Sequence, residues 1–512
     1  MPDWLVGVDV DRIQEYVFES SRLPEIGGAS GLLQEIEDSL KKDFQGRGYK
    51  VVVGGGSMLI WVQGEKSVAE EVARAVESEY ISRTLVCTAT TAIVEWDGRD
   101  LQDARARLAY ELRRAKDEKK TWPWFESLPY ALRCESCNKR PAHYRDTRVP
   151  GESRWLCLAC ERKYEGVRED IKEAKELRHI AEHCGRGKLG VIHLDGDGIG
   201  DKLGRIESWD EIKEFSQALA SALSAAVDGT LSKLEPACPP AKPDDPKPHR
   251  RLFVGGDDLY LFVPGEWALD VALQIEEQFR RKWEGTPEGK WGPVTVSGAV
   301  LIADEHTPVY FLHRLLIDFE RYAKQWKNRL AVSANATVGQ GEGEGWLCFR
   351  VMLSSGSSTG SAREFFDSLL EEPQGMGSPV WEKRTLRPCP AGEVRQLLEW
   401  TRTLKTGGVP QGTILRLRDA MWRSRFEGAV ELAYELARTS KKEAREVLAE
   451  LAGVTAGSQW SHGWRPAAGL NAEGGAQVLE TPIGDLAEIW DFSSRVDDAP
   501  AAQAAAASSR TA

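Results

Sequence analysis

The sequence predicts an α+β protein with two ferredoxin-like (βαββαβ) domains, a four-cysteine zinc module between them and a mostly helical domain at the C-terminal end. Three observations predict this fold. Strand and helix patterns alternate in the order βαββαβα over residues 3–120, residues 188–335 repeat that order, and two CxxC pairs lie between the copies. Self-similarity on this scale indicates an internal duplication.

Length and composition fit several soluble units. The chain has 512 residues, of which 41% are hydrophobic and 29% charged, so we expect three or four units. No apolar run approaches the roughly 20 residues that span a bilayer, and the N-terminal MPDWLVGVDVDR is unlike a signal peptide. We predict a cytoplasmic protein without a membrane partner. The net charge of −12 argues against a surface that coats nucleic acid, although a local basic groove stays possible.

The first predicted domain covers residues 1–125. Its opening strand runs into Asp9-Val10-Asp11, and its hairpin turns at Gly54-Gly55-Gly56-Ser57. The expected elements are a strand at Trp4–Val8, a helix at Ser30–Phe44, a hairpin at Lys50–Val62, a helix at Ser67–Ser82, a strand at Val86–Glu95 and a helix at Leu101–Lys120.

The second predicted domain covers residues 188–350 and repeats these landmarks in register. Asp195-Gly196-Asp197 corresponds to Asp9-Val10-Asp11, and Gly255-Gly256-Asp257-Asp258 corresponds to the first glycine turn. The expected elements are a strand at Leu189–Leu194, a helix at Trp209–Leu234, the hairpin at Arg250–Pro264, a helix at Ala268–Trp283, a strand at Val294–Ala303, a helix at Val309–Lys327 and a closing strand at Arg329–Ser333.

Residues 126–187 are predicted to form the zinc module and a helical linker. Cys134-x-x-Cys137 and Cys157-x-x-Cys160 each place two thiolates on one metal, and together they predict a closed, tetrahedral structural Zn²⁺ site. Basic residues surround the cysteines and indicate either nucleic-acid contact or, as the favoured interpretation, a solvated face. They are Arg133, Lys139, Arg140, Arg154, Arg162 and Lys163.

The remainder is predicted to be a helical domain at residues 351–495 and a disordered, low-complexity tail at 496–512. Helical periodicity runs from about Glu393 to Leu451. Glycine- and serine-rich stretches, GQGEGEG at Gly339–Gly345 and SSGSSTGS at Ser354–Ser361, predict loops before it.

The glycine turn of the second domain carries the strongest chemical signal. Gly255 and Gly256 permit a sharp turn and close approach of an anion, and Asp257 with Asp258 offers adjacent carboxylates. With Asp195 at the end of the neighbouring strand, they form a candidate site for Mg²⁺ or Mn²⁺, which take hard oxygen ligands. The plain alternative is a solvated turn, since Gly and Asp are common turn residues.

A pair of lysines recurs in both halves. Lys324 and Lys327 lie three apart on one helix face, where they could hold phosphate oxygens, and Lys116 and Lys119 occupy the matching positions. For lysines in general, ordinary solvation is the simpler interpretation. The first turn has Gly56 and Ser57 in place of the carboxylates, so we expect the first half to seat a nucleotide without supplying the catalytic metal.

Several segments together resemble the large subunit of type III CRISPR effector complexes. They are Asp9–Leu33 (DVDRIQEYVFESSRLPEIGGASGLL), the four-cysteine module, Leu194–Gly204 (LDGDGIGDKLG), Phe253–Pro264 (FVGGDDLYLFVP) and TPIGDLAEIWDF near the C-terminal end. In that family two palm domains flank a zinc module, and the second palm, which bears the GGDD motif, converts ATP into cyclic oligoadenylates when the complex holds target RNA.

The resemblance implies roles and partners. Asp195, Asp257 and Asp258 would ligate metal, Ser30 in the GGAS segment would lie near the nucleotide, and ATP would be the substrate. Other effector subunits, guide RNA and target RNA would be partners. The sequence contains no His-Asp dipeptide, so nuclease activity is not expected and the chain is expected to be a short form. Two alternatives stay open: a non-catalytic nucleotide- or RNA-binding scaffold, and a stand-alone cyclic (di)nucleotide synthase.

Overall fold

The computed structural model describes residues 3–20, 22–119, 130–148, 153–166, 173–239, 245–285, 290–333, 343–352, 361–371, 380–472 and 476–498. The α+β class that the sequence predicts is confirmed. None of the helices in these ranges is long and apolar enough to cross a membrane. Most of the predicted tail and most of the glycine- and serine-rich stretches lie outside the described residues. The predicted disorder is wrong at Val496–Asp498, which form a short 3-10 helix with Val496 buried.

The first half contains a four-stranded antiparallel sheet in the order β2-β3-β1-β4. Residues Leu5–Val8 of β1 are all buried, because both faces of this sheet are covered. The elements are β1 (Asp3–Val10), α1 (Ile13–Phe18), α2 (Leu23–Gly46), β2 (Lys50–Gly54), β3 (Ser57–Gln63), α3 (Lys66–Thr84), β4 (Ala89–Trp96) and α4 (Leu101–Glu118). Asp100 caps the N-terminus of helix α4, and its carboxylate accepts the Asp103 N–H.

The second half repeats this order as β8-β9-β7-β10 and extends the sheet with two further strands, β11 and β14. The elements are β7 (Lys188–Gly196), α7 (Ile199–Gly204), α8 (Trp209–Ala237), β8 (Arg250–Gly255), β9 (Asp258–Pro264), α9 (Ala268–Glu284), β10 (Val296–Asp304), α10 (Val309–Ser333), β11 (Trp346–Val351) and β14 (Cys389–Pro390). β11 pairs parallel to β10.

The closing strand expected at Arg329–Ser333 is wrong. These residues continue helix α10, and the sheet takes its next strand from β11, beyond the glycine-rich stretch. Over only five residues, the spacing of Leu330 and Val332 fits the period of a strand as well as that of a helix. The place beside β10 is taken instead by β11, which pairs with it.

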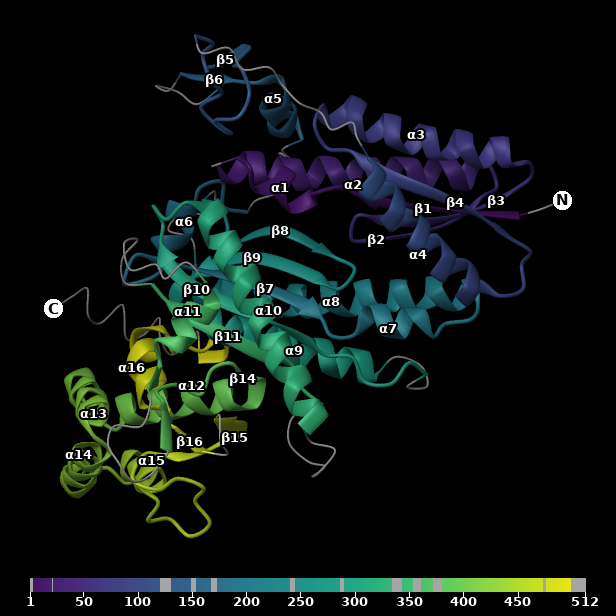
Figure 1. The fold of residues 1–512 in the computed structure, drawn as a ribbon. Coiled ribbons are helices and arrows are strands. Elements are labelled where there is room, and N and C mark those ends of the chain that lie inside the picture. The colour runs from purple at the N-terminus through teal and green to yellow at the C-terminus, as the bar shows by residue number, and fades with distance from the viewer. Residues whose placement is uncertain are drawn as a thin grey trace.

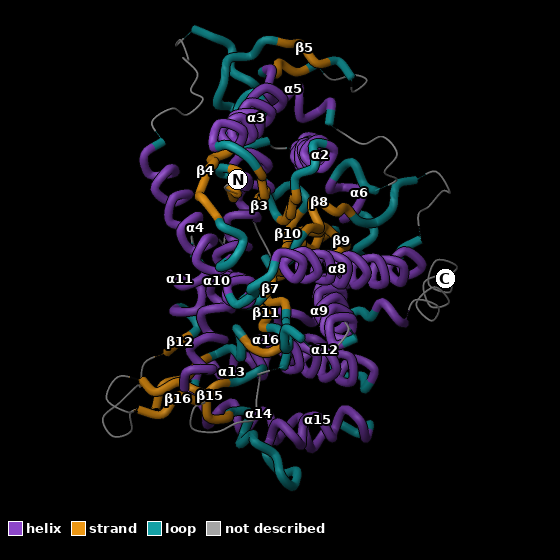
Figure 2. The backbone as a smooth tube through the Cα atoms, turned by 90° about the vertical axis from the view of Figure 1, so that its right-hand side faces the viewer, coloured by secondary structure: helices purple, strands orange, loops and turns teal. Residues whose placement is uncertain are grey.

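The two halves pack reciprocally (Figures 1 and 2). Helix α2 of the first half contacts β8 of the second, and α8 of the second contacts β2 of the first. The two glycine turns meet at the centre of this arrangement, because a Cβ placed on Gly256 would lie 3.7 Å from the Gly55 nitrogen. The duplication seen in the sequence is therefore also a spatial pairing of equivalent elements.

The cysteine module lies on the helices of the first half (Figure 1). It contains a two-stranded ribbon, β5 (Tyr144–Asp146) and β6 (Arg154–Leu156), followed by α5 (Leu158–Glu165), and α5 packs on α2 and α3. A long helical linker was expected after it. The described residues contain instead the end of α5 and the short helix α6 (Leu177–Ala181).

The C-terminal region is helical, as predicted, and also contains a mixed four-stranded sheet, β12-β13-β16-β15, that the sequence analysis missed. Its elements are α11 (Ala362–Asp367), β12 (Leu370–Glu371), β13 (Val380–Lys383), α12 (Ala391–Thr406), α13 (Gln411–Arg423), α14 (Arg425–Arg438), α15 (Lys442–Ala452), β15 (Arg465–Ala472), β16 (Ala476–Glu480) and α16 (Ile483–Ile489). The fully buried Arg387 pairs with Asp485 and Glu488 of α16 and joins this region to the second half by donating to the Phe349 carbonyl of β11.

Candidate functional site

The GGDD segment forms a two-residue β-turn between β8 and β9. Gly255 pairs with Asp258, and Gly256 and Asp257 occupy the turn. Gly256 has φ +62°, in the left-handed region that glycine adopts without strain. The first half has the same construction, with Gly54 paired to Ser57 and Gly55 and Gly56 in the turn. The predicted correspondence between the two turns is confirmed.

Strand periodicity places two of the predicted carboxylates side by side. His193 pairs with Tyr260 and Leu194 with Leu259, so Asp195 follows beside Asp258 on the adjacent strand. The first half has the equivalent pair in register, Asp9 opposite Ser57.

The third carboxylate approaches from the turn. A Cβ on Gly196 would lie only 2.7 Å from the Asp257 Cβ, so the close approach of the turn to β7 requires glycine at this position. Burial, together with the negative charges of Asp258 and Asp257, raises the pKa of Asp195 to about 7, against the opposing effect of Lys324. Burial and then Asp258 also raise the pKa of Asp257.

The donor set fits a hard divalent cation. A cation would relieve the repulsion among the three carboxylates, and the buried Asp258 Oδ1 has no hydrogen-bond partner within the described part of the chain. His193 Nε2 lies 3.2 Å from this oxygen but outside hydrogen-bond geometry. The carboxylate oxygens do not form a group of three within 4.8 Å of one another; among the described residues only the four cysteines do so.

The predicted lysines contact the aspartates at the end of β7. Lys324 pairs with Asp195 and donates to the Gly196 carbonyl (3.1 Å), and Lys327 donates to Asp197 Oδ2 (2.8 Å). In the first half Lys116 lies 2.8 Å from Asp9 Oδ2, and Lys119 lies 2.6 Å from Asp11 Oδ2. The recurrence of the lysines therefore reflects two repeated Asp–Lys pairs, a role that the sequence analysis did not foresee.

Ser30 lies on α2 alongside the hairpin. It is half-buried, between Gly27, which packs against Arg250 at the start of β8, and Glu37, whose carboxylate accepts the Gly56 backbone N–H. Its predicted place near a nucleotide stays a prediction.

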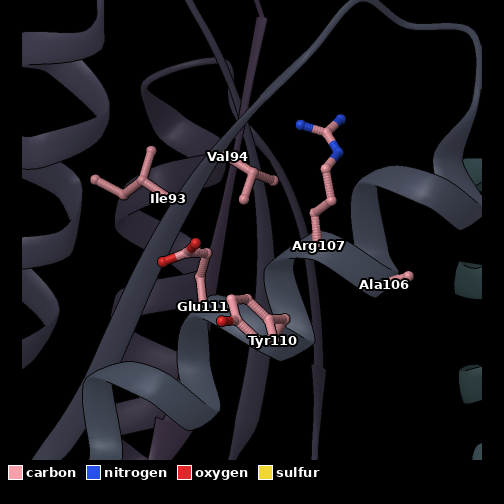
Figure 3. Close-up of a pocket in the computed structure, with 6 residues that line it drawn as sticks. All are labelled: Ile93, Val94, Ala106, Arg107, Tyr110 and Glu111. Carbon is pink, nitrogen blue, oxygen red and sulfur yellow. The ribbon is translucent and has the colours of Figure 1, made fainter. Parts of the chain in front are cut away.

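A cavity of about 360 Å³ lies between the two halves at the glycine turns. Gly54, Ser57, Gly256 and Asp257 border it together with apolar side chains of α4 and α8. A second cavity, of about 390 Å³, lies between β4 and α4 (Figure 3), away from the carboxylates. Its labelled residues include Arg107, Tyr110 and Glu111, and no predicted site residue lines it.

The raised pKa of Asp195 makes stability depend on pH. A carboxyl whose pKa is raised in the folded state contributes most to the free energy of unfolding at pH values below its pKa in the unfolded chain. For Asp195 this contribution is lost as the pH rises through about 7. Without metal, Asp195→Asn should therefore raise the free energy of unfolding at pH 8 by about 1–2 kcal/mol and change it little at pH 5. The expected change in free energy is smaller than the full pKa shift would give, because the Asp195 side chain is 32% exposed and solvent screens its charge.

Urea unfolding at the two pH values measures this effect. Asp9→Asn is the matched control, and it should not stabilise the protein, because Asp9 is 47% exposed and loses its pair with Lys116. Equal destabilisation by Asp195→Asn at both pH values would contradict the expectation.

The four cysteines form a cluster with the geometry of a zinc site. All four are buried, and their sulfur atoms lie within 4.8 Å of one another. Cys137 Sγ and Cys157 Sγ are 3.9 Å apart, close to the roughly 3.8 Å that four Zn–S bonds of about 2.3 Å impose in a tetrahedron. Cys134, Cys137, Cys157 and Cys160 therefore fit structural zinc, as predicted.

The basic residues of the module dock it onto the first half. The Lys163 side chain is fully buried, and its Nζ lies 2.8 Å from Glu19 Oε1. Arg140 forms a bidentate ion pair with the same carboxylate. Arg154 pairs with the buried Glu25. Neither a nucleic-acid surface nor a solvated face describes these three residues. The exposed ones are Arg133, Lys139 and Arg162. Sequence reasoning missed the acidic partners, because Glu19 and Glu25 lie more than 100 residues away.

Lys163→Met tests this docking. Removing one partner of a buried ion pair leaves Glu19 less compensated, so the free energy of unfolding should fall by about 3 kcal/mol. Arg162→Met, on the exposed side of the same helix, should change it by less than about 0.5 kcal/mol. Chemical denaturation compares the two variants, and equal effects would argue against a docking role.

Comparison with known proteins finds a family likeness in the second half. Residues 188–332 match the family model described as Cas10/Cmr2, second palm domain. Over these residues the chain is similar to that palm domain. The resemblance that the sequence predicts is thereby confirmed, and the matched segment coincides with β7 to α10, which carry the GGDD turn and Asp195.

Two solved structures with TM-scores of at least 0.50 are similar to this chain in fold. A crystal structure of a Csm1-Csm4 cassette in complex with pppApApA is 15% identical, with a TM-score of 0.52 over 96% of this chain and 70% of that chain. A cassette in complex with one ATP is 16% identical, with a TM-score of 0.50 over 89% and 66%. The cassette in complex with cA4 is 15% identical, with a TM-score of 0.44, and the match spans 64% of this chain and 53% of that one, about half its length. No curated protein matches.

Proposed function

We propose that this Cas10-like chain is a metal-dependent nucleotidyltransferase that joins ATP into cyclic oligoadenylates, as the large subunit of a type III CRISPR effector. The observation that carries the proposal is the GGDD turn, which sets Asp257 and Asp258 beside Asp195 at the point where the two halves meet. The strand orders β2-β3-β1-β4 and β8-β9-β7-β10 support ferredoxin-like palms in both halves.

The residues of the second palm would have distinct roles in this reaction. Asp195, Asp257 and Asp258 would hold Mg²⁺ or Mn²⁺, which when bound activates the attacking hydroxyl and neutralises the triphosphate. Gly255 and Gly256 keep the turn narrow enough for phosphate to approach the backbone. Lys324, which pairs with Asp195, is placed to turn from that carboxylate to a phosphate oxygen.

Partners follow from the same proposal. The similar chains come from Csm1-Csm4 cassettes, in complex with ATP or with cA4. Other effector subunits, guide RNA and target RNA are accordingly the proposed partners, and ATP the proposed substrate.

The first half would provide a second nucleotide seat. It keeps the glycine turn and the Asp9–Lys116 pair but has Gly56 and Ser57 in place of the carboxylates. Lys116→Met should then reduce nucleotide binding, measured by calorimetry with a non-hydrolysable ATP analogue and Mg²⁺, from two sites to one. Lys66→Met, an exposed lysine on α3, is the control. Unchanged stoichiometry in Lys116→Met would contradict the second seat.

Mass spectrometry of the products tests the function. The protein is incubated with ATP and Mn²⁺ or Mg²⁺, with and without RNA and added effector subunits. Cyclic oligoadenylates and released pyrophosphate are the expected products. Binding of guide RNA and subunits without turnover would favour the scaffold alternative, and a cyclic dinucleotide made without RNA would favour a stand-alone synthase. The four nucleoside triphosphates, supplied singly, establish base preference.

A further inference from the structure

Both halves contain the same polar clamp at the end of the first strand. In the first half Lys119 and two threonines, Thr88 and Thr90, hold the Asp11 carboxylate, with distances of 2.6–3.0 Å. In the second half Lys327, Thr295 and Ser297 hold Asp197 Oδ2 at 2.8, 2.7 and 2.6 Å. The backbone bonds repeat too, from Asp11 N to Thr88 O and from Asp197 N to Thr295 O.

The clamps differ in their last bond. Lys119 donates to Ala89 O, within its own sheet, at 2.9 Å. Lys327 instead donates to the carbonyl of Glu344 at 3.0 Å, just before β11. The hydroxyl of Ser297 accepts the Trp346 N–H at 2.9 Å. The clamp of the second half is therefore bonded to the segment 344–346, for which the described residues of the first half show no counterpart.

The side chain of Glu344 extends this connection into the C-terminal domain. Its Oε2 accepts the Gly392 N–H at 2.6 Å, in the first turn of α12, where a helix favours negative charge. The adjacent Ala391 N–H donates to Gly345 O at 2.9 Å. A continuous chain of hydrogen bonds thus runs from α12 through Glu344 and Lys327 to Asp197, two residues from Asp195.

We propose that Glu344 and Lys327 are positioning residues that couple the C-terminal domain to the metal-binding end of β7. A shift of α12 moves residues 344–346, which moves the clamp and with it Asp195. The expected consequence is that a ligand of the C-terminal domain controls metal binding, and this consequence rests on the proposed function. The coupling itself is a property of the fold.

Two alanine substitutions separate coupling from general stability. Glu344→Ala removes the bond to α12 and leaves the backbone carbonyl that Lys327 uses. Glu488→Ala is the matched control: Glu488 accepts the Val351 N–H at 2.6 Å, at the opposite end of β11, and its loss leaves the buried Arg387 with one acid fewer. Glu344→Gln retains an acceptor oxygen and should behave as wild type.

Hydrogen–deuterium exchange of the full chain without metal is the first readout. Glu344→Ala should accelerate exchange of peptides covering residues 195–198 about 3- to 10-fold. Glu488→Ala should lower the melting temperature more while leaving that peptide unchanged. The second readout is the Mn²⁺ dependence of pyrophosphate release, whose half-saturating concentration should rise by a similar factor in Glu344→Ala alone.

Each outcome bears on a different claim. Unchanged exchange in Glu344→Ala, or equal acceleration by Glu488→Ala, overturns the coupling. Accelerated exchange in a protein that is inactive even as wild type supports the coupling and refutes the proposed function. Accelerated exchange with an unchanged Mn²⁺ requirement overturns the control of metal binding.

Discussion

Asp257→Ala combined with Asp258→Ala is expected to lower pyrophosphate release from ATP by about 10³-fold or more. The two carboxylates are the turn's only charged groups, and the cation they would hold supplies both activation of the nucleophile and neutralisation of the triphosphate. Burial raises the pKa of Asp195, and the charges of Asp258 and Asp257 raise it further. Their removal relieves this repulsion, so the variant should unfold no more easily than wild type without metal.

Ser57→Ala is the matched control, because Ser57 occupies the position of Asp258 in the first glycine turn. It should retain nearly all activity. If the double variant turns over ATP within about tenfold of the wild-type rate, the GGDD carboxylates are not required for catalysis. Loss of activity accompanied by early unfolding would instead indicate a structural effect, which the denaturation curve distinguishes.

Cys137→Ser is expected to abolish zinc binding and unfold the cysteine module. The module has only a small apolar core besides its thiols, so metal ligation supplies most of its folding free energy, on the order of 10 kcal/mol in comparable zinc sites. The consequence should reach the first half, since Glu19 and Glu25 would lose Arg140, Lys163 and Arg154 and remain as buried acids without partners.

Zinc content by atomic spectroscopy and limited proteolysis of residues 130–166 measure this outcome. Cys184→Ser, at a buried thiol outside the cluster, should keep one zinc per chain and resist cleavage as wild type does. A Cys137→Ser protein that retains zinc, or a module that resists protease without it, would contradict the assignment.

The cysteine module also contacts residues next to the candidate site. Glu19, which its Arg140 and Lys163 hold, directly follows Phe18, and Phe18 stacks on His313 of α10 with ring centroids 3.7 Å apart. Phe18 also packs against Tyr260 of β9, two residues from Asp258. The module therefore helps to fix how α1 of the first half packs against the second half beside the GGDD hairpin.

Local signals were sufficient for much of the fold. The period-2 and period-3.6 patterns located most strands and helices of both halves, the two glycine turns and the cysteine pairs. They missed the short helices α1 and α7 and the strands β11 and β14. They failed where local pattern is ambiguous or absent. The end of α10 was mistaken for a strand, and β12, β13, β15 and β16 were missed because they are short or have irregular pairing.

By itself the sequence determined which of two equivalent turns carries carboxylates, because residue identity at matched positions is a local property: Asp257 and Asp258 against Gly56 and Ser57. Only the tertiary structure decided what the charged residues bind. Lys116, Lys119, Lys324 and Lys327 pair with strand-end aspartates. Arg140 and Lys163 pair with the buried Glu19, which directly follows α1, and Arg154 pairs with the buried Glu25 of α2. The energy of a charge depends on burial and on neighbours distant in sequence, which the order of residues does not specify.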